Sequence, residues 1–322
     1  MTSTTHATEP ATAGTTTPDR GLHAVPPGVA YHRVLAGEKR RVGRGILAIV
    51  LLLAGMTLFS ILLPMVASLI DAQMGRVTPF FGGTDYTPLY HGSAMASVAL
   101  LIPWSMLIQR WLYKVPGASL HSVISHFRFD LFARSLLLIA PLVVAVLLVS
   151  DYLAPQEQTI WAHTDILWLF ALTLVLTPLQ SAGEEYGFRG LIFRIAGSWG
   201  RGPSTGLFLG VLVSSLAFAF MHLATDPWLN LWYLVFGVST ALITWRTGGI
   251  EIAVVMHAVF NTIAFALDFA LGTDQVQAGD RATGAANAVI LIPAGLYALI
   301  AVVVLIRKRR SGPALTPSGP TE

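Results

Sequence analysis

The chain has 322 residues, of which 54% are hydrophobic and only 11% are charged, with a formal net charge of +3. Soluble domains carry roughly 25% charged residues, so this composition overrides the two soluble domains that length alone suggests and predicts one polytopic membrane domain. The sequence contains no cysteine, which excludes disulfides, thiolate metal sites and a cysteine nucleophile.

The amino-terminal segment precedes the apolar part of the chain. Residues 1–28 are rich in Thr, Ala and Pro without apolar periodicity, which predicts a disordered tail and not a signal peptide. Residues 32–44 form a basic cluster that we interpret as an ordinary topology signal in preference to a specific lipid-binding site. Residues 1–44 are therefore expected to be a tail followed by a basic juxtamembrane segment.

The middle of the chain carries apolar runs long enough to cross a bilayer, which takes about 20 helical residues. Eight such runs predict an all-α, polytopic membrane domain over residues 45–306. A basic and then disordered tail is expected at 307–322. The predicted spans are residues 45–70, 93–112, 131–150, 164–182, 206–223, 228–245, 250–271 and 287–306.

The distribution of charge orients these spans. With both termini inside, all but two of the 20 Lys and Arg residues lie on the inner side. The two exceptions, Arg76 and Arg281, share the outer segments with several Asp and Glu residues. This asymmetry follows the positive-inside rule, and it predicts a multi-pass protein of the plasma membrane with cytoplasmic termini.

Two adjacent carboxylates lie in or beside the fourth apolar run, within residues 181–190. An ionisable group at the bilayer centre costs on the order of 2.5–3.5 kcal/mol, so it indicates a functional site. Glu185 and Arg189 have the i,i+4 spacing that favours a helical ion pair, and we predict a supporting role for this pair. Glu184 is rotated by about 100° from Glu185, lacks that partner and is free for chemistry.

Two histidines, His222 and His257, fall within apolar spans. Residues i and i+4 share a helix face, so Asn261 points the same way as His257, and Phe218 stacks against His222. Each of these residues alone is more simply explained as a packed or hydrogen-bonded side chain. Together with Glu184, they predict a single site.

The residue types in this site suit water activation and hydrolysis, with Glu184 as the general base. His222, His257 and Glu184 can bind a divalent metal such as zinc. Alternatively, the imidazoles and the amide of Asn261 can stabilise an oxyanion without a metal. A proton-coupled transporter that uses the same groups as a relay is a further alternative.

Three motifs in this region resemble those of the CPBP intramembrane proteases, the CAAX-protease and bacteriocin-processing family. The resemblance covers residues 184–261, a minor part of the membrane domain. The family motifs EExxxR, FxxxH and HxxxN correspond here to Glu184-Glu185-x-x-x-Arg189, Phe218-x-x-x-His222 and His257-x-x-x-Asn261.

This resemblance implies a glutamate-dependent or metal-dependent endopeptidase with a conical active-site cavity open to the cytoplasm. Glu184 would activate water, while His222, His257 and Asn261 would bind the metal or the oxyanion. The implied partners are the bilayer and a membrane-associated or lipidated peptide or protein, with no nucleic acid; eukaryotic members cleave prenylated CAAX proteins. Some members act as non-catalytic scaffolds or bacteriocin-immunity proteins, which is the alternative function.

The predicted span boundaries conflict at this site. Counted from Gly206 at 1.5 Å per residue, His222 lies about 24 Å from the inner side. A fourth span that ends at residue 182 leaves Glu184 near the inner surface, where the two cannot meet. We therefore expect the helix carrying Glu184 to be longer and tilted, with residues 197–210 partly re-entering the membrane.

Overall fold

The structure, a computed structural model, describes residues 21–318. This part of the chain is helical and contains no β-strand, only three isolated bridges. The helices are α1 (Val42–Gln73), α2 (Pro88–Ala99), α3 (Leu101–Ile108), α4 (Phe129–Leu153), α5 (His163–Glu185), α6 (Phe193–Trp199), α7 (Pro203–Met221), α8 (Pro227–Thr247), α9 (Glu251–Leu271), α10 (Gln275–Ala278) and α11 (Leu291–Arg307).

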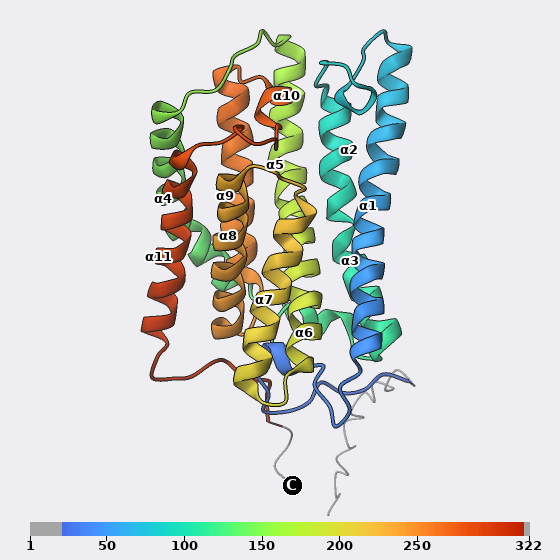
Figure 1. The fold of residues 1–322 in the computed structure, drawn as a ribbon, viewed down its shortest axis with the longest axis vertical. Coiled ribbons are helices and arrows are strands. Elements are labelled where there is room, and N and C mark those ends of the chain that lie inside the picture. The colour runs from blue at the N-terminus through green and yellow to red at the C-terminus, as the bar shows by residue number, and fades with distance from the viewer. Residues whose placement is uncertain (1–20, 319–322) are drawn as a thin grey trace, which may run out of the picture.

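Eight helical segments within the described residues are long and apolar enough to cross a membrane. The long helices run roughly side by side along the long axis of the molecule (Figure 1). The predicted all-α fold with eight spans is therefore confirmed. The neighbours that matter for the site are α5 against α2 and α9, and α7 against α6 and α8.

The helix that carries the glutamates is longer than the predicted fourth span. It continues from His163 to Trp199, through Pro178 and through a π-helical turn at Tyr186–Ile192. A boundary at residue 182 was therefore wrong, and the expectation of a longer helix is confirmed. Residues 203–210 begin α7, which packs against α6 as a helical hairpin. The expected partial re-entry of residues 197–210 into the membrane stays a prediction.

The boundaries of α8 follow from local chemistry. Asp226 caps its first turn, where Oδ1 accepts hydrogen bonds from the amides of Trp228 (2.8 Å) and Leu229 (3.0 Å). Pro227 occupies the first helical position, where a missing N–H costs nothing. Gly248 has a φ of 72° and ends the helix in a left-handed conformation that glycine adopts without strain.

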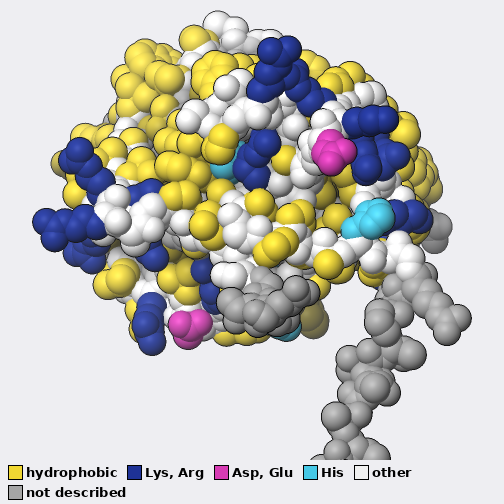
Figure 2. Space-filling view, turned by 90° about the horizontal axis from the view of Figure 1, so that it is seen from below, with side chains coloured by type: hydrophobic (Ala, Val, Ile, Leu, Met, Phe, Trp, Pro, Cys, Tyr) yellow, Lys and Arg dark blue, Asp and Glu magenta, His cyan; other side chains and the backbone are white. Residues whose placement is uncertain are grey.

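Both described ends of the chain lie at the lower end of the molecule in Figure 1. Seen from that end, Lys and Arg side chains are spread over the surface and outnumber the acidic ones (Figure 2). This end of the fold therefore carries an excess of basic side chains, as the sequence predicts for the inner side. The plasma membrane and the cytoplasmic location of the termini stay predictions.

The predicted tails are only partly described, because residues 1–20 and 319–322 lie outside the described residues. Within the described part, the two ends of the chain pair with each other. The Thr316 amide donates to the Val29 carbonyl oxygen (2.9 Å), and the Val29 amide donates to Thr316 Oγ1 (3.0 Å). Val29 and Thr316 are therefore held against each other, while the disorder expected for 1–28 and 307–322 stays a prediction.

The basic juxtamembrane segment also packs against the helical hairpin. Arg33 donates to the carbonyl oxygens of Gly197 (2.8 Å) and Gly200 (2.9 Å). His32 is 1% exposed, and its Nε2 donates to the carbonyl oxygen of Pro203 at 3.1 Å. This segment therefore has a structural role in addition to its predicted topological one.

Burial of His32 makes stability depend on pH. Burial lowers its pKa from 6.5 to about 4, so the unfolded chain binds this proton more tightly than the folded chain. The contribution of the neutral, buried His32 to the free energy of unfolding is fully present above pH 6.5 and is lost as the pH falls toward 4. Between pH 7 and pH 5 we expect a loss of about 2 kcal/mol. The H32Q variant keeps a hydrogen-bond donor but should lack this pH-dependent loss of stability when the free energy of unfolding is measured in detergent. Equal pH dependence of the unaltered protein and H32Q would contradict the prediction.

Candidate functional site

The two adjacent glutamates end α5 and are both buried, with Glu184 5% and Glu185 0% exposed. The π-helical turn Tyr186–Ile192 follows at once. Such turns are rare and occur often at functional sites, because the extra residue per turn re-aims the neighbouring side chains. The backbone therefore departs from regular α geometry immediately after the two carboxylates.

A close helix contact fixes this part of α5. A Cβ atom added to Gly183 would lie 2.2 Å from the carbonyl oxygen of Val98, which is backbone that cannot move aside easily. The glycine therefore lets α5 approach the end of α2 closely. This contact holds Glu184 and Glu185 at a defined depth.

Glu185 is the centre of a buried charged group. Its Oε1 lies 3.2 Å from Nη1 of Arg189 and accepts a hydrogen bond from Nδ1 of His257 at 2.8 Å. The predicted ion pair is confirmed. The guanidinium also lies over the rings of Phe218 (4.1 Å) and Phe236 (5.2 Å). Glu185 therefore orients a histidine as well as an arginine, which the sequence did not predict.

Glu184 keeps one oxygen without a hydrogen-bond partner. Its Oε1 accepts from Nε2 of Gln180 at 2.6 Å. Its Oε2 is buried without a partner, 3.9 Å from Nε2 of His257. That separation is too long for a direct hydrogen bond and suits a bridging water.

His257 and Asn261 occupy one face of α9, as predicted. Because Nδ1 of His257 donates to Glu185, a neutral His257 presents a lone pair at Nε2. The Asn261 amide donates to Gln180 Oε1 (3.2 Å) and Ser181 Oγ (3.3 Å). Asn261 is thereby joined through Gln180 to the carboxylate of Glu184.

His222 follows the last residue of α7. Its Nδ1 donates to the carbonyl oxygen of Phe218 at 2.8 Å, so a neutral His222 also presents a lone pair at Nε2. Its ring stacks on Tyr233 with 3.8 Å between centroids, and it meets the Phe218 ring at 4.6 Å. The predicted contact between Phe218 and His222 is confirmed.

The four predicted catalytic residues line one cavity of about 320 Å³. Glu184 reaches it from α5, His222 from the turn after α7, and His257 and Asn261 from α9. The remaining wall is mostly aromatic and includes one loop residue, Arg281. Three helices that are separate in the sequence thus bring these side chains into a common space.

The lining residue Arg281 bears on where the cavity opens. It belongs to the loop between α10 and α11, at the end of the molecule away from the termini (Figure 1). An opening beside Arg281 would face away from the termini, whereas the sequence predicts that both the opening and the termini are cytoplasmic. The side of the membrane that the cavity faces stays a prediction.

Gln180, Tyr233 and Arg281 are among the lining residues that the sequence analysis missed. Gln180 could have been found, because it stands four residues before Glu184 and so shares its helix face. Tyr233 and Arg281 gave no signal, because their contacts with the site depend on how distant segments pack.

The central part of the chain matches a known family. Residues 163–263 match the family described as "Type II CAAX prenyl endopeptidase Rce1-like". This part of the chain is similar to that family. The match spans all three motifs, and it agrees with the CPBP resemblance read from them.

One curated relative has a related sequence. The uncharacterized protein YyaK of Bacillus subtilis (strain 168) is 29% identical over 168 residues, which are 50% of this chain and 55% of YyaK. The chain thus spans about half the length of the curated relative that it matches. The relative carries no assigned function that could be transferred.

The fit of a metal to this site depends on the chemistry of the side chains and on their spacing. Two neutral imidazoles and a carboxylate are zinc ligands, and the hydrogen bond from His257 to Glu185 is typical of a metal-binding histidine. However, the described residues contain no group of three or more His, Asp or Glu close enough to hold a metal ion. The spacing therefore does not fit, and zinc at Glu184, His222 and His257 stays a prediction for metal analysis of the purified protein.

Proposed function

We propose that this chain is an intramembrane endopeptidase that hydrolyses peptide bonds of membrane-associated or lipidated substrates. The observation that carries this proposal is the shared cavity of Glu184, His222, His257 and Asn261. Oε2 of Glu184 is buried without a hydrogen-bond partner. Such a group lowers stability, and a catalytic role explains why the protein contains one. The match to Rce1-like endopeptidases supports the same reaction.

The attacking water is held between two acceptors. It donates one hydrogen bond to Oε2 of Glu184 and the other to Nε2 of His257, which are 3.9 Å apart. This leaves an oxygen lone pair directed at the substrate carbonyl. Glu184 takes a proton as the water oxygen bonds to the carbonyl carbon.

Glu184 then delivers that proton to the leaving amine nitrogen as the carbon–nitrogen bond breaks. The products are a carboxylic acid and an amine, and the side chain returns to its starting form. Gln180 holds the other oxygen of Glu184 throughout, which keeps the reacting oxygen oriented.

The negative charge on the carbonyl oxygen needs donors. The amide of Asn261 is one, since its present hydrogen bonds at 3.2 and 3.3 Å are long and can be exchanged. Nε2 of His257 can donate only from the protonated ring, whose Nδ1 contacts the Glu185 carboxylate. His222 can donate from Nε2 only when it is protonated, because its Nδ1 is occupied by the Phe218 carbonyl.

Loss of His257 should slow hydrolysis without removing the substrate site. We expect the H257A variant to lower kcat by about 10²-fold, with a smaller effect on KM. The measurement uses protein in liposomes with a membrane peptide in ¹⁸O-labelled water, because hydrolysis places ¹⁸O in the new carboxyl group.

The matched control is H163A, which removes an exposed histidine at the start of α5. Unchanged ¹⁸O incorporation in H257A would contradict the assigned role. If the unaltered protein gives no cleavage products, the endopeptidase proposal is wrong and the non-catalytic scaffold alternative remains.

A further inference from the structure

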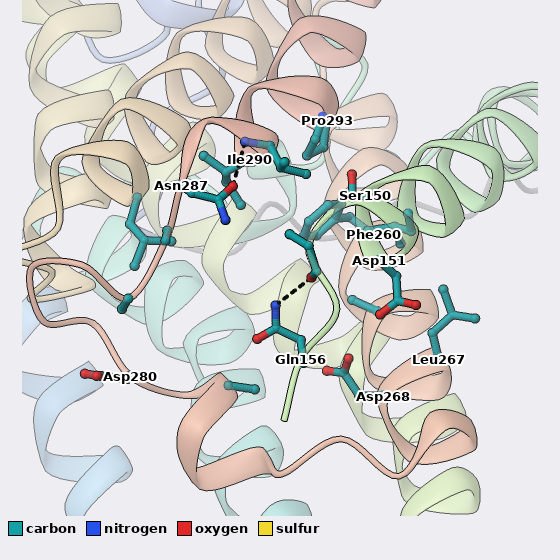
Figure 3. A pocket seen from close by; sticks show the side chains of 18 of the residues that line it. Ser150, Asp151, Gln156, Phe260, Leu267, Asp268, Asp280, Asn287, Ile290 and Pro293 are labelled. Carbon is teal, nitrogen blue, oxygen red and sulfur yellow. Dashed lines mark hydrogen bonds between the residues drawn. The ribbon is translucent and has the colours of Figure 1, made fainter. Parts of the chain in front are cut away.

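A loop arginine stands where the candidate active-site cavity meets a second cavity. Arg281 and Phe260 line both of them. The second cavity has a volume of about 270 Å³ and lies among α4, α9 and α11. Figure 3 shows it, with Asp151 and Asp268 on one side and Asp280 on the loop side. Arg281 is therefore placed at the junction between the reacting groups and a further binding space.

The backbone of this arginine is fixed relative to the site. Its carbonyl oxygen accepts hydrogen bonds from the amides of Thr225 (2.9 Å) and Asp226 (3.2 Å). The buried carboxylate of Asp226 in turn accepts from the Gly284 amide at 2.9 Å. The loop is thus tied to the turn that follows His222, and Arg281 keeps its position beside that histidine.

Within the described residues, the guanidinium of Arg281 makes only local hydrogen bonds. It donates only to two carbonyl oxygens of its own loop, those of Ala278 (3.5 Å) and Asp280 (3.2 Å). It forms no ion pair in the described part of the chain. Arg76, at the same end of the molecule, contrasts with it because it pairs with Asp165 at 2.8 Å. Arg281 therefore retains most of its capacity to donate to a ligand.

Among the residues that the structure describes, no other Lys or Arg lines the cavity that contains Glu184. A guanidinium binds a carboxylate with two parallel hydrogen bonds, and such charge-assisted bonds are stronger than neutral ones. We propose that Arg281 binds a carboxylate of the peptide substrate and so selects peptides with an acidic group near the scissile bond. This inference rests on the proposed function for its ligand class.

The carboxylate can come from the carboxyl terminus of the peptide or from an Asp or Glu side chain. The two sources are separated with a dansylated octapeptide of Ala and Leu made in three forms. One is the free acid, one is the carboxamide, and one is the carboxamide with a single internal Glu. Binding is measured by fluorescence polarisation on full-length E184Q protein in phosphatidylcholine nanodiscs, where no turnover occurs.

In this E184Q background we expect the free acid or the Glu peptide to bind about tenfold tighter than the plain carboxamide. The double variant E184Q/R281Q should show no such preference. The double variant E184Q/R281K should keep part of it. R76Q is the matched control, because it removes an arginine charge from the same end without lining the cavity. The inference is overturned if the plain carboxamide binds equally well, or if R281Q keeps the preference.

A kinetic measurement separates this inference from the proposed function. In the active protein, R281Q should raise KM for the preferred acidic peptide about tenfold and leave kcat nearly unchanged. Acid-selective binding that depends on Arg281 but occurs without cleavage would remove the proposed hydrolysis and keep the inference. If the unaltered protein and R281Q both cleave the acidic peptide with the same KM, the inference about Arg281 is wrong and the proposed hydrolysis stands.

Discussion

Replacing Glu184 by Gln should lower kcat for peptide hydrolysis by about 10²–10⁴-fold. The variant E184Q removes the base that takes the proton from water. It preserves the shape of the side chain and an oxygen that can still accept from Gln180. The protein should therefore insert and fold as before. The measurement is the cleavage rate of a membrane peptide by protein in liposomes, with circular dichroism as the test of folding.

The matched control is E157Q, the same substitution at an exposed loop glutamate. It should leave the rate unchanged. Retained cleavage in E184Q would remove Glu184 from the mechanism. If instead the cellular phenotype of the protein survives E184Q, the non-catalytic scaffold or immunity reading would gain support.

Replacing Arg189 by Met should destabilise the fold by about 3–5 kcal/mol. Arg189 and Glu185 are both 0% exposed and pair at 3.2 Å. Removing the arginine leaves the Glu185 carboxylate buried, with only His257 as a partner, and it also removes the cation from over the Phe218 ring. The free energy of unfolding is measured by denaturant titration in mixed micelles.

The control for this prediction is R201M, which removes an exposed arginine at the turn between α6 and α7. It should change stability by less than about 1 kcal/mol. The double variant E185Q/R189M should recover part of the loss, since no buried carboxylate then lacks its partner. A stability of R189M equal to that of R201M would show that the buried pair is not structurally required.

Much of the fold and part of the site follow from local sequence. Span length and apolar composition predict the eight helices, because a bilayer imposes both. The i,i+4 rule predicts the pair of Glu185 with Arg189 and the shared face of His257 and Asn261. These are relations within one helix, where the geometry is fixed by the backbone.

The remaining features depend on relations between helices. The helix of the fourth span continues beyond Glu185 through a π-helical turn to Trp199, although the apolar run ends earlier, so the apolar pattern gives a wrong end for this span. The hydrogen bond from His257 to Glu185 joins residues 72 positions apart. No single-segment pattern contains that information, and the same holds for the approach of Arg281 to the cavity.

The most direct measurement of the central claim is an experimental structure of E184Q with a bound, uncleaved membrane peptide. The account predicts the scissile carbonyl carbon within about 4 Å of the position 184 side chain, and the carbonyl oxygen within hydrogen-bond distance of Asn261 or a histidine. A peptide bound elsewhere, or Glu184, His222 and His257 facing separate spaces, would contradict it.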